Sequence, residues 1–557
     1  MLYTGKPTGP IPQLDLLTFL FDSPYTLAAE TTVIHAEAAN PSNAITKASA
    51  RQLTRRMAHT LRERFGIGKN GAGKDIVLVV STGQILVPIL FLAVIAAGGV
   101  ASLASPSYKK EELAKQIEQG PPSYVYLAPL LGVHLLISAA SLNQFPLDRC
   151  LVLDSAPSQW RLHLLTDTSA RNIIGELELD WERITAKEEL ENSLISLLWS
   201  SGLQARPKVH ISHTNIVAAT AIEGGSLREH WKRAGKWEYR TLAHLPTAHI
   251  AGNFILCSHI QRNNTVTTGG CCFWMPTFNF EKFLAFNKSL RITTFLSVPP
   301  IFLLISKSPL VQDHFRALKV ATSGAAPLGK ELQIGASKKL GVFLAQTWGL
   351  TETTGSVSGG DVGFEDLSGS VGPLLSSHLI IFVRIIDDSD NDCPPNTPGE
   401  IIVQGPIVTK GYHNNPEANA EAFKDGFFRT GDIGFIQNER LYIVDRKKEL
   451  IKYKGLQVAP AELEAVLLSH PHILDAAVIG IYDEKECTEV PRAYVVADKT
   501  VIGATAIQEF VKNRLASHKQ VRGGVEYVNQ IPKSAAGKIL RKEIRAIAQR
   551  STKKAKL

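Results

Sequence analysis

Cysteine is scarce in this chain, and neither long apolar runs nor an excess of charge is present. Six cysteines occur among 557 residues, without the spacing of a metal-ligand set. We therefore expect neither a disulfide scaffold nor a zinc module, and we expect the protein to be in a reducing compartment. Hydrophobic residues make up 44% and charged residues 20% of the chain, a balance that excludes a disordered or fibrous protein.

Little net charge remains outside the last residues of the chain. Of the formal net charge of +8, residues 541–557 contribute +6, because they hold seven Lys or Arg and one Glu. The other 540 residues therefore carry +2. We do not expect the body of the protein to bind nucleic acid through a basic surface.

No apolar stretch is long enough to cross a bilayer. The longest, Ile85–Ala97, has 13 residues and contains Pro88, whereas a spanning helix needs roughly 20. A buried strand at 76–80, a turn and a buried helix explain this segment without a membrane span. The first residues also lack a charged segment followed by an apolar one, so secretion is not expected.

The order of apolar segments predicts an α/β protein of more than one domain. The chain is too long for one ordinary domain, and no repeat of roughly 20–50 residues is evident. Strand-like and helix-like segments alternate up to about Pro373, which predicts largely parallel sheets. Short strands separated by turns then predict a β-rich module. The residues after the charged cluster 445–449 have the pattern of a separate α+β domain.

Two glycine-bearing segments could hold phosphate. Gly68–Lys74 has Walker A spacing, but Asp75 follows where a Ser or Thr is needed, and the segment precedes a strand instead of following one. We therefore expect a glycine-rich turn there. The second segment, Trp199–Lys208, follows an apolar run and offers hydroxyls, a glycine and a lysine to phosphate oxygens. By itself it could equally be a solvated loop.

Longer motifs carry a resemblance to a known family. They are SGAAPLGKEL at 323–332, QTWGLTETTG at 346–355, GFFRTGDIG at 426–434, DRKKELIKYKGLQVAPAELE at 445–464 and PKSAAGKILRKEI at 532–544. In this order they make the chain similar, over almost its full length, to the acyl- and aryl-CoA synthetases of the adenylate-forming superfamily. The most similar branch is that of the 4-coumarate–CoA ligases and luciferases.

The resemblance implies an AMP-forming acid–thiol ligase. Such an enzyme joins a carboxylic acid, here aryl or fatty acyl, to ATP with release of pyrophosphate, and then passes the acyl group to coenzyme A. ATP, Mg²⁺ and coenzyme A are thus the implied cofactor and cosubstrates. The implied fold is a large N-terminal domain over 1–444, with parallel-rich α/β subdomains and a β-rich module. A hinge at 445–448 and a small, mobile α+β domain over 449–557 follow.

The resemblance also implies catalytic roles for four residues. Lys538 bridges the α-phosphate and the substrate carboxylate, Thr351 contacts the α-phosphate and Glu352 holds Mg²⁺. His249 borders the acyl pocket and the path of coenzyme A. The implied contacts to ATP or coenzyme A, besides Thr351 and Lys538, are Ser200, Ser201, Gly202, Lys208, Ser323, Gly324, Ala325, Gln346, Trp348, Gly349, Asp432, Arg446, Lys448, Lys452, Lys454, Gly455 and Gln457.

Several of these residues have ordinary alternatives. In the resemblance, Trp348 stacks beside adenine, Asp432 accepts hydrogen bonds from the ribose hydroxyls, and Arg446 is a second ribose contact. Residue preferences alone favour Asp432 as a turn residue and the threonines of WGLTET as helix N-caps. A histidine between apolar residues is often structural. Lys447 is expected to be a solvated surface residue.

The phosphate loop departs from the family pattern. Leu203, Gln204 and Ala205 stand where the family usually has Thr-Thr-Gly, and no glycine follows Lys208. Two hydroxyls are thereby lost, and Ala205 restricts a backbone that glycine would leave free. We expect weaker ATP binding or slower adenylation. The alternatives are an adenylation enzyme that loads a carrier protein, and a non-catalytic binder of nucleotide or acyl-CoA.

The tripeptide Ala555-Lys556-Leu557 is a close variant of the Ser-Lys-Leu signal for peroxisomes. It predicts binding to the peroxisomal import receptor and a peroxisomal location. The cytoplasm is the alternative.

Overall fold

The apolar runs of the first half of the chain form the strands of a seven-stranded sheet. The computed structural model describes residues 1–5, 10–119, 124–127, 145–156, 160–199, 208–248, 265–360, 363, 365–375, 381–484, 486–534 and 537–555. The strand order is β7-β6-β5-β3-β4-β8-β9, with parallel pairing from β6 to β8 and an antiparallel strand at each edge. The strands are β3 (Ile76–Val80), β4 (Val100–Ala104), β5 (Tyr124–Leu127), β6 (Cys150–Asp154), β7 (Arg161–Leu164), β8 (Ser196–Trp199) and β9 (Lys208–Ile211).

Helix α3 (Val87–Ala96) explains the most apolar stretch of the sequence. All ten of its residues are buried, and it packs against the long amphipathic helix α2 (Lys47–Phe65). The segment Gly68–Lys74 lies in the turn after α2, where the Gly68 N–H donates to Asp75 Oδ2 at 2.7 Å. The predicted glycine-rich turn is therefore confirmed. Within the described residues, no helix combines the length and apolar character needed to span a bilayer.

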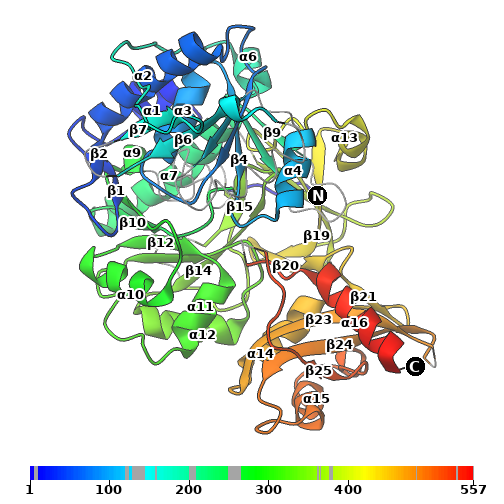
Figure 1. Cartoon of the computed structure of the whole chain (residues 1–557). Helices are drawn as coiled ribbons and strands as arrows, with labels where there is room; N and C mark the ends of the chain where they lie inside the picture. The colour runs from blue at the N-terminus through cyan, green and yellow to red at the C-terminus, as the bar shows by residue number, and fades with distance from the viewer. Residues whose placement is uncertain are drawn as a thin grey trace.

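Two further sheets complete the α/β part of the body (Figure 1). One has the order β10-β11-β1-β2 and the other β12-β13-β14-β15. Pairing is parallel from β12 to β14, and β14 then forms an antiparallel hairpin with β15. The strands are β1 (Val33–Glu37), β2 (Ala44–Thr46), β10 (Arg240–Ala243), β11 (Cys271–Trp274), β12 (Thr294–Ser297), β13 (Val320–Ser323), β14 (Leu344–Leu350) and β15 (Gly355–Gly359).

The predicted β-rich module is an antiparallel sheet of five strands. Its order is β16-β17-β19-β18, and β20 pairs with β19. The strands are β16 (Phe382–Ile386), β17 (Gly399–Gln404), β18 (Phe423–Lys424), β19 (Phe427–Gln437) and β20 (Arg440–Arg446). Apolar side chains of this sheet join the main hydrophobic core, which extends from Ile11 to Leu441.

The residues after β20 form a smaller α+β domain, orange to red in Figure 1. Its own buried clusters begin at Ile451 and include no residue of the body. A three-stranded sheet, β23-β24-β25, packs against helices, and β21 and β22 form a separate hairpin. The elements are β21 (Ile451–Tyr453), β22 (Leu456–Val458), α14 (Pro460–Ser469), β23 (Ile473–Asp483), β24 (Thr488–Ala497), α15 (Ala504–Lys512), η2 (Ser517–Lys519), β25 (Val525–Tyr527) and α16 (Arg541–Ala555).

The remaining helices cover the sheets of the body. They are α1 (Leu16–Phe21), α4 (Lys110–Gln119), η1 (Leu147–Arg149), α6 (Lys187–Asn192), α7 (His213–Ala234), α9 (Thr265–Thr268), α10 (Phe280–Ser289), α11 (Pro299–Lys307), α12 (Lys330–Leu340) and α13 (Pro416–Ala422). The architecture confirms the predicted fold class, an α/β body with parallel-rich sheets and a small α+β domain.

Candidate active site

The turn between β14 and β15 presents Thr351 and Glu352. Both residues are buried, and residues 351–354 form a turn, so the expectation of a helix N-cap at WGLTET is wrong. The Thr353 hydroxyl fixes this turn, because it donates to the Gly355 carbonyl at 2.7 Å and accepts from the Leu350 N–H at 2.9 Å. A side chain at Gly349 would overlap the carbonyl oxygen of Gly355, which explains the glycine.

Glu352 has a partner that the sequence does not point to. The hydroxyl of Tyr412 donates to Glu352 Oε1 at 3.0 Å, and the Thr409 N–H donates to the Glu352 carbonyl at 2.9 Å. Burial and the adjacent Glu352 raise the pKa of Tyr412, so its hydroxyl keeps its proton. Tyr412 lies 60 residues from Glu352 in a segment without a recognisable pattern, and no spacing signal could have found it.

Asp432 lies on β19 with a donor at each carboxylate oxygen. The indole N–H of Trp348 donates to Oδ2 at 2.8 Å, and Arg446 Nε lies 2.6 Å from Oδ1. Asp432 and Arg446 are direct partners in the β19–β20 ladder, so the antiparallel register places the arginine beside the carboxylate. Asp432 is thus a strand residue, and the turn expected from residue preferences is wrong.

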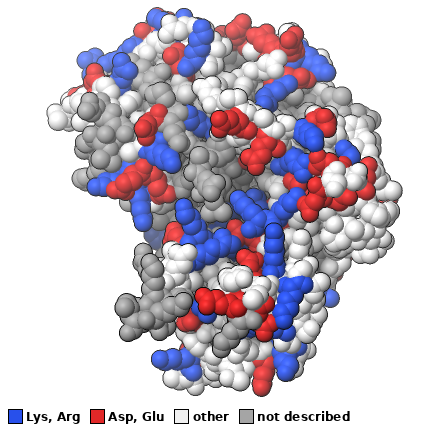
Figure 2. All heavy atoms as spheres, turned by 90° about the vertical axis from the view of Figure 1, so that its right-hand side faces the viewer, with Lys and Arg blue, Asp and Glu red and all other residues white. Residues whose placement is uncertain are grey.

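Lys538 comes from the C-terminal domain into this group. Burial, together with a smaller effect of Arg446, lowers its pKa to about 8, while Glu352 and Asp432 oppose the shift. These electrostatic contacts join Lys538 to the turn after β14 and to β19 and β20. Positively charged side chains gather where the body meets the C-terminal domain, as Figure 2 shows.

The loop that carries Lys538 is held by both domains. Its backbone turns tightly, with the Ser534 N–H donating to the Lys538 carbonyl at 2.8 Å. Gly537 has a φ of 78°, and a side chain there would press against Pro300 of α11 in the body. Behind the loop, Arg541 forms a buried ion pair with Glu464 of α14 at 2.6 Å. The lysine therefore depends on packing from α11 and α14.

Ser323, Gly324 and Ala325, at the carboxyl end of β13, lie together with Gln346 near the start of β14. Ser323 is the parallel partner of Gln346, and a side chain at Gly324 would lie 3.0 Å from the methyl group of Thr347. The Ser323 hydroxyl is buried and has no hydrogen-bond partner among the described residues. Such a group is a candidate to bind a ligand, because buried polar atoms are normally paired.

Lys208 begins β9 and lies opposite Trp199 of β8. Its ammonium lies 5.7 Å from the centre of the Trp199 ring, and burial lowers its pKa. The predicted contacts Ser200, Ser201 and Gly202, the altered residues 203–205, and His249 lie outside the described residues.

The hairpin β21–β22 carries four of the predicted coenzyme A contacts. Lys452 is paired across the hairpin with Gln457, and Lys454 and Gly455 form the turn. Lys454 Nζ lies 2.5 Å from Glu486 of the same domain. This ion pair holds the tip of the hairpin to its own domain.

The predicted hinge residue Lys448 lies between anchors to the two domains. Lys447 Nζ lies 2.8 Å from Asp388 and 3.2 Å from Glu400, both of the body, and Glu449 pairs with Arg545 of the C-terminal domain at 2.6 Å. Lys447 is exposed, with 42% of its side chain accessible, so the expectation of a solvated surface residue is confirmed, and its two ion pairs are what the sequence did not indicate. Lys448 is near enough to Lys538 to lower its pKa.

Magnesium fits the described residues through a single carboxylate. No group of three or more His, Cys, Asp or Glu that could hold a metal occurs in the described part of the chain. Mg²⁺ commonly uses one or two carboxylates together with substrate phosphates and water. Glu352 offers one carboxylate of this kind, since Tyr412 contacts Oε1 and, among the described residues, Oε2 has no hydrogen-bond partner.

Comparisons with known proteins identify a family and similar structures. The AMP-binding enzyme family matches residues 27–413, and the AMP-binding enzyme C-terminal domain matches residues 462–538. A putative acyl-coenzyme A synthetase of Emericella nidulans is 44% identical over 99% of each chain. A phenylacetyl-CoA ligase of Aspergillus niger is 33% identical over 97% of this chain and 98% of its own. The crystal structure of ATP-bound MatB from Rhodopseudomonas palustris is similar with a TM-score of 0.80 and 25% identity, over 96% of this chain and 98% of that one.

Proposed function

The chain belongs to the AMP-binding enzyme family, and we propose that it activates an aryl or fatty carboxylic acid with ATP and Mg²⁺ and passes the acyl group to coenzyme A. It is an AMP-forming acid–thiol ligase, as are the acyl-CoA synthetases and 4-coumarate–CoA ligases to which it is similar. One observation carries the proposed site. The loop that carries Lys538 packs on Pro300 of the body, and the buried ammonium is near enough to Glu352, Asp432 and Arg446 for their charges to influence its pKa.

In the first half-reaction, a carboxylate oxygen of the acid attacks the α-phosphorus of ATP. The bond from that phosphorus to the bridging oxygen breaks, and pyrophosphate leaves. Two anions must meet for this step, so fixed positive charge lowers its barrier. With a pKa of about 8, Lys538 is largely charged at neutral pH. We assign it to the α-phosphate and the acid, with Thr351 as a second phosphate contact.

The ends of ATP are assigned to residues on either side of Lys538. Asp432 and Arg446 hold the ribose, and Trp348 borders the adenine, together with Ser323, Gly324, Ala325, Gln346 and Gly349. Lys208, with Ser200, Ser201 and Gly202, is assigned to the outer phosphates. Mg²⁺ when bound neutralises phosphate charge, and Glu352, oriented by the Tyr412 hydroxyl, would hold it.

In the second half-reaction, the sulfur of coenzyme A attacks the acyl carbon. The bond to the AMP oxygen breaks, AMP leaves, and the thiol proton passes to solvent. We propose that the C-terminal domain turns about Lys448 to allow this step. The anchors of Lys447 to the body and of Glu449 to the C-terminal domain support a pivot between them. The turn would bring Lys452, Lys454, Gly455 and Gln457 toward coenzyme A, beside His249.

The class of acid can be tested together with the reaction. By name, similar proteins act on phenylacetate and 4-coumarate, so a first panel contains these two acids with hexanoate and decanoate. The purified full chain is incubated with each acid, ATP, MgCl₂ and coenzyme A, and AMP and thioester are measured by mass spectrometry. Thioester equal to AMP for one acid supports the proposal and names the class.

Two results would favour the alternatives. Acid-dependent AMP and pyrophosphate without thioester would indicate a carrier protein as the acceptor. ATP binding without any acid-dependent product would favour a non-catalytic binder, for which the altered residues Leu203, Gln204 and Ala205 give the reason.

We also propose that the protein is imported into peroxisomes by the receptor for Ser-Lys-Leu-type signals. The proposal rests on the sequence Ala555-Lys556-Leu557; the last two residues lie outside the described part of the chain. A fluorescent protein fused to the amino end should co-localise with a peroxisomal marker in yeast, and deletion of Leu557 should disperse it. Diffuse fluorescence of both forms would indicate the cytoplasm.

A further inference from the structure

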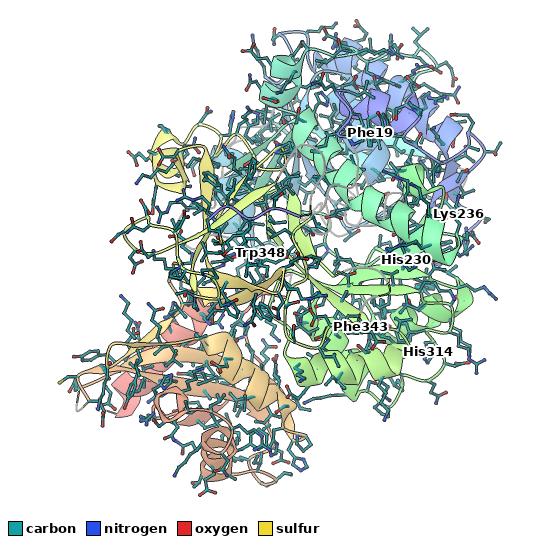
Figure 3. All side chains as sticks on the ribbon, turned by 180° about the vertical axis from the view of Figure 1, so that it is seen from behind. Phe19, His230, Lys236, His314, Phe343 and Trp348 are labelled. Atoms are coloured by element: carbon teal, nitrogen blue, oxygen red, sulfur yellow. The ribbon has the colours of Figure 1, made fainter. Side chains whose placement is uncertain are left out.

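Trp348 joins two parts of the site that are distant in sequence. It lies on β14, at the junction between the green sheet and the yellow β-rich module in Figure 3. Its indole N–H reaches across to Asp432 Oδ2 on β19, 84 residues further along the chain, at 2.8 Å. Both residues are buried, with exposed fractions of 8% for Trp348 and 4% for Asp432. A buried hydrogen bond to a charged acceptor is among the stronger ones in proteins.

The contacts with Trp348 and Arg446 leave the carboxylate of Asp432 able to accept further hydrogen bonds. A carboxylate offers about four acceptor positions, two on each oxygen. Trp348 donates a hydrogen bond to one on Oδ2, and the ion pair with Arg446, whose Nε lies 2.6 Å from Oδ1, occupies the side of the other oxygen. Among the described residues, acceptor capacity therefore remains on each oxygen. A pair of neighbouring hydroxyl groups, as in ribose, requires this arrangement of one acceptor on each oxygen.

Fixing both oxygens also fixes the plane of the carboxylate. With Arg446 alone, the group could turn about its Cβ–Cγ bond and still keep one contact. With the Trp348 hydrogen bond on Oδ2 and the Arg446 ion pair on Oδ1, rotation breaks the hydrogen bond and lengthens the ion pair. The free acceptors therefore point in constant directions before the nucleotide binds, and such preorganisation increases affinity.

We propose that Trp348 is a positioning residue that sets the selectivity of this site for a ribose with both hydroxyls, in addition to any contact of its ring with adenine. The proposal rests on the proposed function, in which Asp432 binds the ribose of ATP. It differs from adenine stacking in one measurable respect. Stacking affects ATP and the deoxy-ATPs equally, because all contain adenine, whereas orientation of Asp432 affects ATP most, because ATP uses both carboxylate oxygens and each deoxynucleotide uses only one.

The test compares ATP with 2′-deoxy-ATP and 3′-deoxy-ATP by isothermal titration calorimetry. The full chain is used with MgCl₂ and without acid. In the wild type, loss of one hydroxyl should weaken binding by about 10- to 150-fold, which corresponds to one hydrogen bond to a charged group. Trp348→Phe keeps an aromatic face and removes the N–H. This variant should lower the ratio of the affinity for ATP to the affinity for each deoxynucleotide at least threefold, mainly by weakening the binding of ATP.

Trp181→Phe is the matched control. Trp181 is also buried, and its indole N–H donates to Thr18 Oγ1 at 3.0 Å, near α1 and away from the site. This variant should retain the wild-type ratio. Trp348→Tyr also lacks the indole N–H, so the test does not depend on the folding of one variant.

Each other result has a separate meaning. An unchanged ratio in the Trp348 variants, with both nucleotides weakened alike, would overturn the inference and leave stacking as the role of this ring. Equal binding of ATP and both deoxynucleotides by the wild type would also overturn it. No binding of ATP by the wild type would overturn the proposed function itself.

Discussion

Gly329 lies where the body meets the C-terminal domain, at the start of α12. A methyl group at this position would lie 2.8 Å from Cβ of Ala465 on α14. Carbon atoms pack at about 3.5–4.0 Å, so Gly329→Ala would have to move the two helices apart by roughly 0.7 Å or more. The contact exists only while α14 faces α12, which is the arrangement that places Lys538 beside Glu352 and Asp432.

The size of the effect follows from the cost of overpacking. Inserting a methyl group into a packed contact typically costs about 1–3 kcal/mol. Here the cost is confined to one arrangement of the domains, so the equilibrium constant for forming it should fall by about 5- to 140-fold. In the mechanism that we propose, the adenylation half-reaction requires this arrangement and the thioester-forming half-reaction does not.

Two assays separate the half-reactions. Acid-dependent exchange of pyrophosphate into ATP reports adenylation, and thioester formation from chemically prepared acyl-adenylate and coenzyme A reports the second step. With the best acid of the panel, Gly329→Ala should reduce the exchange rate and leave the second step at or above the wild-type rate.

Gly503→Ala is the control for a methyl group added at a helix start. Gly503 is the N-cap of α15, as Gly329 is of α12, and both have extended backbones without a side-chain cap. No atom lies within 4 Å of an added Cβ at Gly503, so both half-reactions should be retained. Equal loss of the two half-reactions in Gly329→Ala, or an unchanged exchange rate, would refute the role given to this contact.

Three further predictions follow from the charged groups. Burial lowers the pKa of Lys538 to about 8, so kcat/KM for adenylation should decrease as the pH rises through that value. Lys538→Arg, whose guanidinium stays charged, should lack this decrease. The same decrease in the wild type and in Lys538→Arg would contradict the assignment of this pH dependence to Lys538. Tyr412→Phe removes the donor to Glu352 and should raise the Mg²⁺ concentration for half-maximal exchange by about tenfold or more, whereas an unchanged requirement would show that Glu352 needs no such support. Burial raises the pKa of Glu464 from 4.5 to about 7, against the effect of Arg541. The folded domain then binds this proton more tightly than the unfolded chain, so thermal stability should decrease as the pH rises between these values, and Glu464→Gln should flatten that dependence in melting curves.

Local patterns were sufficient for much of the fold. The apolar run at 76–80 and the apolar stretch after it became β3 and the fully buried α3, because a segment that is apolar on all sides has no solvent-facing alternative. The change to short strands separated by turns near Pro373, and the α+β pattern after Asp445, likewise correspond to separate sheets. The turn at Gly68–Lys74 could be predicted because this segment precedes a strand, whereas a Walker A loop follows one.

Contacts between distant segments could not be predicted in this way. WGLTET has good helix-capping residues, but pairing of β14 with β15 overrides that preference and makes a hairpin turn. Lys447 is exposed as predicted, but its ion pairs could not be predicted because Asp388 and Glu400 are distant in sequence. For the same reason, nothing indicated that Tyr412 would contact Glu352, or that the N–H of Trp348 would point at Asp432. The motifs supplied the residues of the site, and tertiary packing supplied their partners.

The central claim is that Lys538 completes an adenylation site formed with Glu352 and Asp432. Acid-dependent exchange of pyrophosphate into ATP by the wild type and by Lys538→Ala, alongside thioester formation from acyl-adenylate, tests it most directly. The account predicts exchange by the wild type, its loss by a factor of about 100 or more in Lys538→Ala, and retention of the second step. Undiminished exchange in Lys538→Ala would contradict the account.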